Sequence, residues 1–127
     1  MVVTYKPILY IAGPMRGYPD FNHPSFFAVA SIAESLGWRV INPAILPTDL
    51  PDSCYMPICL AMLEACDAIY VLPGSENSTG AKAEKAYAAV QGITELHDYD
   101  DLVREYALYQ HEPEPQQLSF KVEVAND

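Results

Sequence analysis

The chain has 127 residues and a formal net charge of −10, and half of its residues are hydrophobic. This length suffices for a single core, and we expect one domain over residues 1–127. The acidic balance excludes a general nucleic-acid binder, which needs a basic face against phosphates. No uncharged apolar run approaches the ~18 residues of a membrane span, and the amino terminus lacks the features of a signal peptide. We therefore expect a cytoplasmic protein without membrane contact.

The three cysteines, Cys54, Cys59 and Cys66, form no C-x-x-C pair and have no histidine nearby that would complete a zinc site. An odd number of cysteines in an intracellular chain favours reduced, buried thiols. The sequence therefore predicts neither a structural metal nor a set of disulfides.

The first predicted elements alternate between strand and helix. An apolar run at 8–12, which ends in Gly-Pro, predicts a strand that is buried on both faces. Apolar residues at helical spacing predict a helix over 24–36, with Gly37 just past its end. A short second strand is expected over 38–42, where a proline follows and stops it.

The alternation continues in the second half of the core. After a proline-rich loop, a second helix is predicted over 54–65, in which Pro57 is tolerated only in the first turn. A third apolar strand is expected over 67–73, and an alanine-rich helix over 79–91. Alternating strands and helices predict an α/β fold with a mainly parallel sheet and right-handed crossovers.

Beyond residue 92 the pattern is weaker and strongly acidic. Three further elements are expected there: a strand over 93–98, an amphipathic helix over 98–110 and an edge strand over 118–124. Either Asp98 or Asp100 would open the helix. Residues 95–127 hold nine acids against two bases, so this part carries −7 of the net charge. The sequence thus divides into a core, 1–97, and an acidic tail, 98–127.

The apolar run at 8–12 breaks into the loop Gly13–Gly17, in which Arg16 is the single charged residue. In open parallel sheets, ligands bind outside the carboxyl ends of the strands. This loop is therefore a candidate anion site. The alternative is a tight turn whose arginine extends into solvent.

The loop after the third predicted strand, GSENSTG, is a second candidate. Ser78 and Thr79 offer hydroxyl groups, and Gly80 lets a ligand approach a helix amino terminus, where N–H groups are unpaired. Together with Arg16, these residues could hold one phosphate. The alternative is that Ser78 or Thr79 only caps the helix. Neither loop matches a P-loop or a G-x-G-x-x-G motif.

Glu84 lies about one helical turn beyond the second loop, among small residues that would leave room for a substrate. A carboxylate there could act as a nucleophile at a sugar carbon, as Asp and Glu do in glycosidases. Tyr10, near the end of the first strand, could orient this carboxylate. The alternatives are a solvated glutamate paired with Lys85 or another nearby lysine and a tyrosine packed in the core. The spacing alone does not decide between them.

Three segments in this order resemble the nucleoside 2-deoxyribosyltransferase-like superfamily, in particular its small phage and bacterial members and the 2'-deoxynucleoside 5'-phosphate N-hydrolases. The segments are YIAGPMRG, then F-N-x(4)-F followed by GWRVINPA, and then CDAIYVLPG-x(4)-TGAKAE, and they span residues 8 to about 94. The resemblance implies a flavodoxin- or Rossmann-like three-layer sandwich. It also implies assembly into dimers or larger homo-oligomers, in which a neighbouring subunit can complete the site.

Carried over position by position, the resemblance implies that Glu84 is the nucleophile and that Tyr10 lies beside its carboxylate. It further implies a set of loop residues that hold or shape the site of a 5'-phosphate: Gly13, Met15, Arg16, Gly17, Ser78 and Gly80. The implied substrate is a 2'-deoxynucleoside 5'-monophosphate, or a nucleoside, that is cleaved at its N-glycosidic bond. Water or a second base would accept the sugar, and no metal or redox cofactor is required.

Two positions depart from the family pattern. Cys59 stands where relatives commonly have an aspartate that assists the leaving base, and a thiol is a poor substitute near neutral pH. Asp67 is not its positional equivalent and is expected to orient the start of a strand. Ser75 stands where many small relatives have a tryptophan, so an aromatic wall is expected to be lost. Two alternatives to an enzyme therefore remain: a nucleotide-binding protein that has lost catalysis, and a host-interaction protein that uses its acidic tail.

Overall fold

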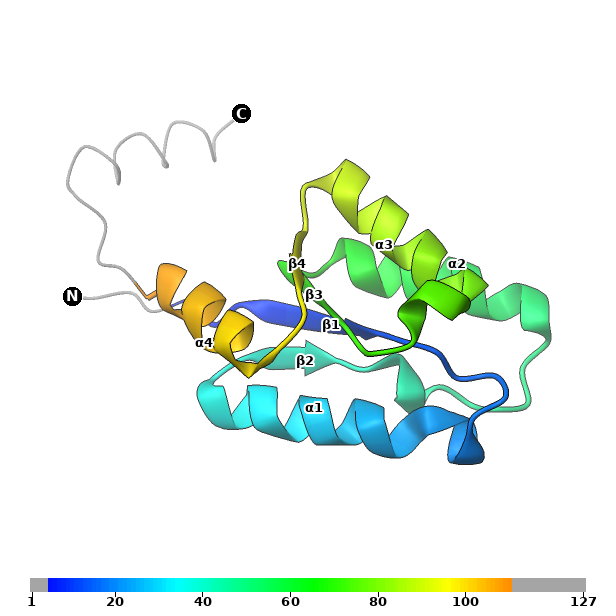
Figure 1. Ribbon diagram of the computed structural model, residues 1–127. Coiled ribbons are helices and arrows are strands. Elements are labelled where there is room, and N and C mark those ends of the chain that lie inside the picture. The colour runs from blue at the N-terminus through cyan, green and yellow to red at the C-terminus, as the bar shows by residue number, and fades with distance from the viewer. Residues whose placement is uncertain (1–4, 111–127) are drawn as a thin grey trace.

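The computed structural model describes residues 5–110 of the chain. One parallel sheet in the order β2-β1-β3-β4 is formed by the strands β1 (Ile8–Ala12), β2 (Arg39–Ile41), β3 (Ala68–Val71) and β4 (Thr94–Leu96). The faces of this sheet are covered by the helices α1 (His23–Leu36), α2 (Asp52–Glu64), α3 (Thr79–Gln91) and α4 (Tyr99–Leu108) (Figure 1). The expected α/β fold is confirmed: it is a flavodoxin-like arrangement of helices on both faces of a parallel sheet.

The core has two parts, one on each face of the sheet. Leu9 and Ile11 of β1 point to the face that α1 and α4 cover, whereas Tyr10 and Ala12 point to the face that α2 and α3 cover. Successive side chains of a strand alternate between faces, and all four are buried because both faces carry helices. Tyr10 therefore points toward the helix that carries Glu84.

Local signals in the sequence set the starts of two helices. α3 begins after Ser78, whose hydroxyl accepts a hydrogen bond from an amide of the first turn, and it ends at Gly92 in the left-handed region. α4 begins after Asp98, whose carboxylate accepts a hydrogen bond from the Asp101 amide. Asp98, rather than Asp100, is thus the residue that opens this helix.

The expected place of Pro57 in the first turn of α2 is wrong. The helix begins two residues earlier than predicted, at Asp52, so Pro57 lies in its second turn. A proline at this position removes the hydrogen bond to the carbonyl of Ser53. Both residues are exposed, so water can take the place of this bond.

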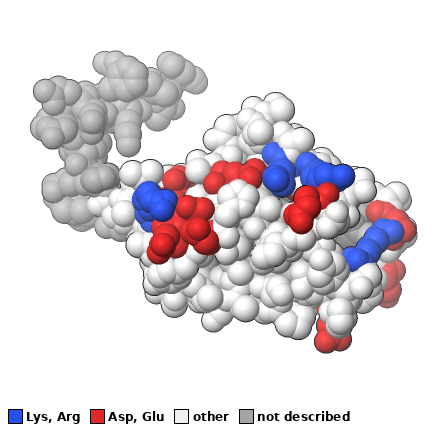
Figure 2. Space-filling model, viewed as in Figure 1, with Lys and Arg blue, Asp and Glu red and all other residues white. Residues whose placement is uncertain are grey.

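Acidic side chains gather around α4 at one end of the molecule (Figure 2). The edge strand expected over 118–124 and the rest of the tail beyond residue 110 lie outside the described residues. The single domain over residues 1–127 therefore stays a prediction. Within residues 5–110, no helix is long and apolar enough to cross a membrane, and no group of three or more His, Cys, Asp or Glu side chains is placed to hold a metal ion.

Candidate active site

A cavity of about 590 Å³ opens at the carboxyl ends of β1, β2 and β3. The loops that follow β1 and β2 line it, together with the amino-terminal halves of α2 and α3. Parallel sheets bind ligands at this end of their strands. Seven of the candidate residues contribute to the lining: Gly13, Met15, Arg16, Ser78, Thr79, Gly80 and Glu84. Tyr10 and Gly17 lie outside the lining: Tyr10 is buried behind Glu84, and Gly17 lies in an exposed turn of the loop after β1.

Glu84 is buried in the wall of the cavity, with 7% of its surface exposed. The Tyr10 hydroxyl donates a hydrogen bond to Glu84 Oε2 and so joins β1 to α3. Burial raises the pKa of Glu84 to about 7, although hydrogen bonds with Tyr10 and Cys59 act to lower it. Burial also raises the pKa of Tyr10 above its usual range, so its hydroxyl stays protonated and remains a donor.

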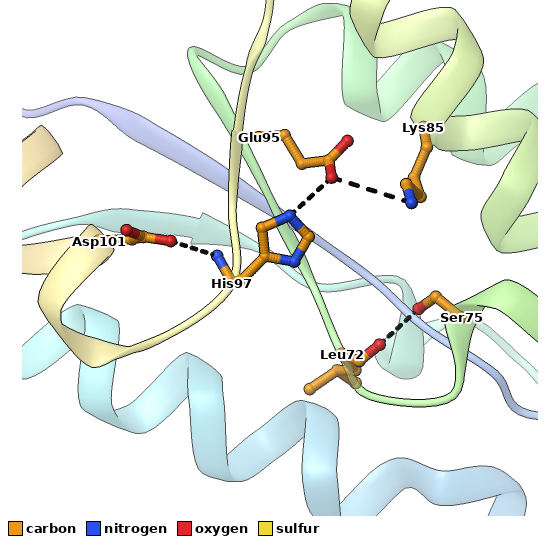
Figure 3. A network of polar contacts seen from close by, with 6 residues as sticks. All are labelled: Leu72, Ser75, Lys85, Glu95, His97 and Asp101. Carbon is orange, nitrogen blue, oxygen red and sulfur yellow. Dashed lines mark hydrogen bonds and ion pairs between the residues drawn. The ribbon is translucent and has the colours of Figure 1, made fainter.

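Lys85, the alternative partner of Glu84, points elsewhere. Its Nζ lies 3.8 Å from Glu95 Oε2 on β4, and His97 Nε2 lies 2.7 Å from the same oxygen (Figure 3). None of these three residues lines the cavity. The alternative of a solvated glutamate paired with Lys85 is therefore wrong, because Glu84 is buried and Lys85 belongs to a separate network of surface charges.

Cys59 of α2 is buried and lines the cavity together with Glu84, and its thiol lies close to the Tyr10 hydroxyl behind the cavity wall. Burial raises the pKa of its thiol, so this group is an even weaker acid than an ordinary cysteine. The resemblance places a carboxyl acid at position 59. This position lines the cavity, but in this chain it carries a neutral thiol. Asp67 lies at the other end of the sheet, where its Oδ2 accepts hydrogen bonds from the Ile8 amide and the Tyr5 hydroxyl, both at 2.8 Å.

Arg16 lies at the mouth of the cavity, where most of its side chain is exposed to solvent. Its Nη2 lies 2.9 Å from Oδ1 of Asp52, the first residue of α2, and both side chains are 78% exposed. Gly17 shapes the turn of this loop, with a φ of 82° in the left-handed region that glycine adopts readily. Gly13 lets the backbone of this loop pack closely against the Leu72 side chain, because a Cβ at position 13 would lie 2.7 Å from Leu72 Cδ1.

Ser78 caps α3, since its Oγ accepts a hydrogen bond from the Ala81 amide at 3.1 Å. Ser78, rather than Thr79, is thus the residue that caps this helix. Ser78 nevertheless lines the cavity, together with Thr79 and Gly80 of the first turn. Amide groups of a first turn lack partners within the helix, so this wall of the cavity is suited to an anion.

An aromatic segment, to which the sequence analysis assigned no role in the site, forms another part of the mouth. Tyr18 and Phe21 line the cavity while 41% and 48% of their surfaces stay exposed. Asp20, Phe21 and Asn22 have positive φ angles of 52°, 54° and 61°, in a region that bulky residues rarely adopt. Asn22 Nδ2 donates a hydrogen bond to the Pro14 carbonyl at 2.9 Å and so fixes the segment. In the sequence, only the Phe-Asn pair indicates this left-handed segment, because asparagine tolerates positive φ angles better than most residues.

Ser75 stands where many small relatives have a tryptophan, so we expected the loss of an aromatic wall there. The Ser75 side chain does not line the cavity. This side chain is buried, and its hydroxyl donates a hydrogen bond to the Leu72 carbonyl at 2.6 Å (Figure 3). Aromatic side chains come from other positions instead: Tyr18, Phe21, Phe26 and Tyr55. The cavity therefore has aromatic surface without a contribution from position 75.

Comparisons with known proteins agree with this architecture. The family described as "Domain of unknown function (DUF4406)" matches residues 7–96. The fold is similar to that of a 2-desoxiribosyltransferase from Leishmania mexicana, with a TM-score of 0.60 and 24% identity, over 72% of this chain and 63% of that one. It is also similar to the Clostridium botulinum CMP N-glycosidase BcmB, with a TM-score of 0.53 and 16% identity, over 92% of this chain and 98% of that one.

At these identities the likeness establishes the fold, and it confirms the structural resemblance to nucleoside 2-deoxyribosyltransferases. The chain spans less than two thirds of the length of the Leishmania protein. No curated protein matches the chain.

Proposed function

The chain belongs to the DUF4406 family, and from its site we propose that it cleaves the N-glycosidic bond of 2'-deoxynucleoside 5'-monophosphates, with Glu84 as the nucleophile. One observation carries the proposal: Glu84 and Arg16 line the same cavity, which also includes the amino terminus of α3. A buried carboxylate and an anion site in one cavity suit a sugar that carries a phosphate. The names of the two structural relatives, a deoxyribosyltransferase and a CMP N-glycosidase, support the same class of reaction.

The proposed reaction has two steps. An oxygen of the Glu84 carboxylate forms a bond with C1' of the deoxyribose as the bond between C1' and the base nitrogen breaks. The base leaves with the bonding electron pair and takes up a proton from solvent. A water oxygen then bonds to C1', the ester bond to Glu84 breaks, and the proton that the water loses returns to solvent. A second base in place of water would give deoxyribosyl transfer.

The other residues support these steps in the proposal. Tyr10 fixes the orientation of the Glu84 carboxylate through its hydrogen bond. The residues assigned to the 5'-phosphate and its loops are Gly13, Met15, Arg16, Gly17, Ser78 and Gly80. No step requires a metal or a redox group. The assembly implied by the resemblance, a dimer or a larger homo-oligomer, is part of the same proposal.

Incubation of the protein with the four 2'-deoxynucleoside 5'-monophosphates tests the proposal directly. We expect chromatography to detect free base, and we expect Glu84→Gln to lower the rate by about 10³-fold or more. Glu34→Gln is the matched control, because it makes the same change on the exposed side of α1. Absence of free base with all four nucleotides at high protein concentration would contradict catalysis.

A nucleotide-binding protein that has lost catalysis is the second candidate. Cys59 favours it, because a buried thiol replaces the carboxyl acid implied by the resemblance. Calorimetry distinguishes the two candidates. For this second candidate we expect the wild type to bind nucleotide without releasing base, and we expect Arg16→Ala to abolish the binding.

A further inference from the structure

The Arg16–Asp52 ion pair occupies the part of the cavity mouth to which the proposed function assigns a phosphate. Among the described residues that line the cavity, Arg16 is the only lysine or arginine, and Asp52 and Glu84 are the only carboxylic acids. The positive charge at the mouth is therefore already matched by a carboxylate. A phosphate that binds Arg16 therefore has to share the guanidinium with this carboxylate or displace it.

The Arg16–Asp52 ion pair is weak, but Asp52 stays at the cavity mouth when the pair is broken. Both side chains are 78% exposed, and exposed ion pairs are weak because water and salt screen them. A bound phosphate can therefore displace the carboxylate from the guanidinium. Asp52 nevertheless stays at the first turn of α2, where the helix dipole favours a negative charge. When the phosphate leaves, the carboxylate can therefore pair with the guanidinium again.

Resting on the proposed function, we propose that Asp52 is a specificity-determining residue that competes with the 5'-phosphate of the substrate for the Arg16 guanidinium. A 2'-deoxynucleoside has no phosphate, so its binding leaves the ion pair intact. The pair therefore reduces the advantage that a monophosphate would otherwise have over a nucleoside. The site thereby accepts both substrate classes, the deoxynucleoside and its 5'-monophosphate.

Calorimetry with the four 2'-deoxynucleosides and their 5'-monophosphates tests this inference. The measurement uses a Glu84→Gln background, in which turnover does not consume the ligand. We expect Asp52→Asn to raise the affinity for monophosphates by about three- to fivefold and to change the affinity for nucleosides by less than about twofold. Asp49→Asn is the matched control, because Asp49 is exposed three residues away and does not line the cavity. It should change either affinity by less than about twofold.

The same change in an Arg16→Ala background separates competition from simple repulsion. Without the guanidinium there is nothing to compete for, so the gain from Asp52→Asn should fall below about twofold. An equal gain in both backgrounds would overturn the inference. Equal effects of Asp52→Asn and Asp49→Asn would overturn it too and would leave the proposed function standing. If neither ligand class binds any of the variants, the proposed function fails, and the inference fails with it.

Discussion

Glu84 combines two properties that seldom occur together in a surface helix: its carboxyl group is buried, and it still lines a cavity that ligands can enter. Burial raises its pKa to about 7, from an ordinary value of 4.5. Near neutral pH the group is therefore present in both protonation states. A nucleophile of this kind is available without a neighbouring cation, while Tyr10 keeps one of its oxygens in place.

The raised pKa predicts how Glu84 affects stability. The native protein holds a proton that the unfolded chain releases, so the contribution of this group is fully present below about pH 4.5 and is lost as the pH rises through about 7. Glutamine does not ionise, so Glu84→Gln removes the decrease in the free energy of unfolding that Glu84 causes as the pH rises. From about pH 4 to about pH 8, we expect the free energy of unfolding of the variant to rise relative to the wild type by on the order of 3 kcal/mol.

Urea unfolding at a series of pH values measures this difference. Glu34→Gln, on the exposed side of α1, is the control and should show no comparable change with pH. A difference between Glu84→Gln and the wild type that stays constant over this pH range would show that Glu84 is not buried as a neutral acid.

Tyr10→Phe should move the pH dependence of the reaction. Attack requires the ionised carboxylate, so kcat/KM of the wild type should rise with pH around the Glu84 pKa of about 7. The Tyr10 hydrogen bond lowers this pKa, and its removal should shift the acid limb to higher pH. Tyr70→Phe is the control, because it removes a hydroxyl from the opposite face of the sheet. An unmoved acid limb in Tyr10→Phe would argue against the positioning role.

At the scale of elements, Gly13 in the loop after β1 and Gly80 in the first turn of α3 should respond differently to substitution by alanine. A Cβ at Gly13 would lie 2.7 Å from the buried Leu72 side chain, whereas a Cβ at Gly80 would lie 3.7 Å from Met56 Cε, an ordinary contact. Gly13→Ala should therefore lower the free energy of unfolding by about 1–3 kcal/mol. Gly80→Ala should leave it unchanged or slightly higher and should weaken nucleotide binding, because the methyl group enters the cavity.

Thermal unfolding and calorimetry on the two variants separate these effects. The reverse result, with Gly80→Ala unstable and Gly13→Ala weak only in binding, would contradict the packing described here.

Most of the elements of the described core could be predicted because their signals are local. The apolar run at 8–12 becomes β1 without a change of bounds, and Ser78 marks the start of α3 as its hydroxyl suits a cap. The start of α2 was misplaced because local rules assign Pro57 to a first turn. The structure instead accepts this proline one turn later, on the exposed side of the helix.

The candidate site was predictable only in part. Arg16 and Glu84 stand out by residue type and by their places after strands. The partner of Arg16, Asp52, comes from the start of α2, which is distant in sequence, and only tertiary packing brings the two together. The same holds for the aromatic mouth, where Tyr18 and Phe21 depend on a left-handed segment that Asn22 fixes. No local sequence pattern predicts these tertiary contacts.

At the scale of the whole molecule, the sheet separates two parts of the core, and the single tryptophan reports on one of them. Trp38 is 2% exposed on the α1 and α4 face, where its Nε1 donates a hydrogen bond to the Leu102 carbonyl at 3.2 Å. Leu63 is fully buried on the opposite face. If both parts unfold together, Leu63→Ala should lower the free energy of unfolding seen by Trp38 fluorescence by about 2–5 kcal/mol.

Urea titrations followed by Trp38 fluorescence and by far-ultraviolet circular dichroism should then give coincident midpoints. A fluorescence transition that Leu63→Ala leaves in place would mean that the two faces fold independently, against the prediction of one domain.

The central claim is that Glu84 and Arg16 act on one ligand in one cavity. A crystal structure of the Glu84→Gln variant with a 2'-deoxynucleoside 5'-monophosphate tests it most directly. We predict that C1' lies about 3–3.5 Å from the side chain at position 84, with the phosphate in hydrogen-bond contact with Arg16 and the first-turn amides of α3. A nucleotide whose sugar lies away from position 84, or whose phosphate binds away from Arg16, would contradict the claim.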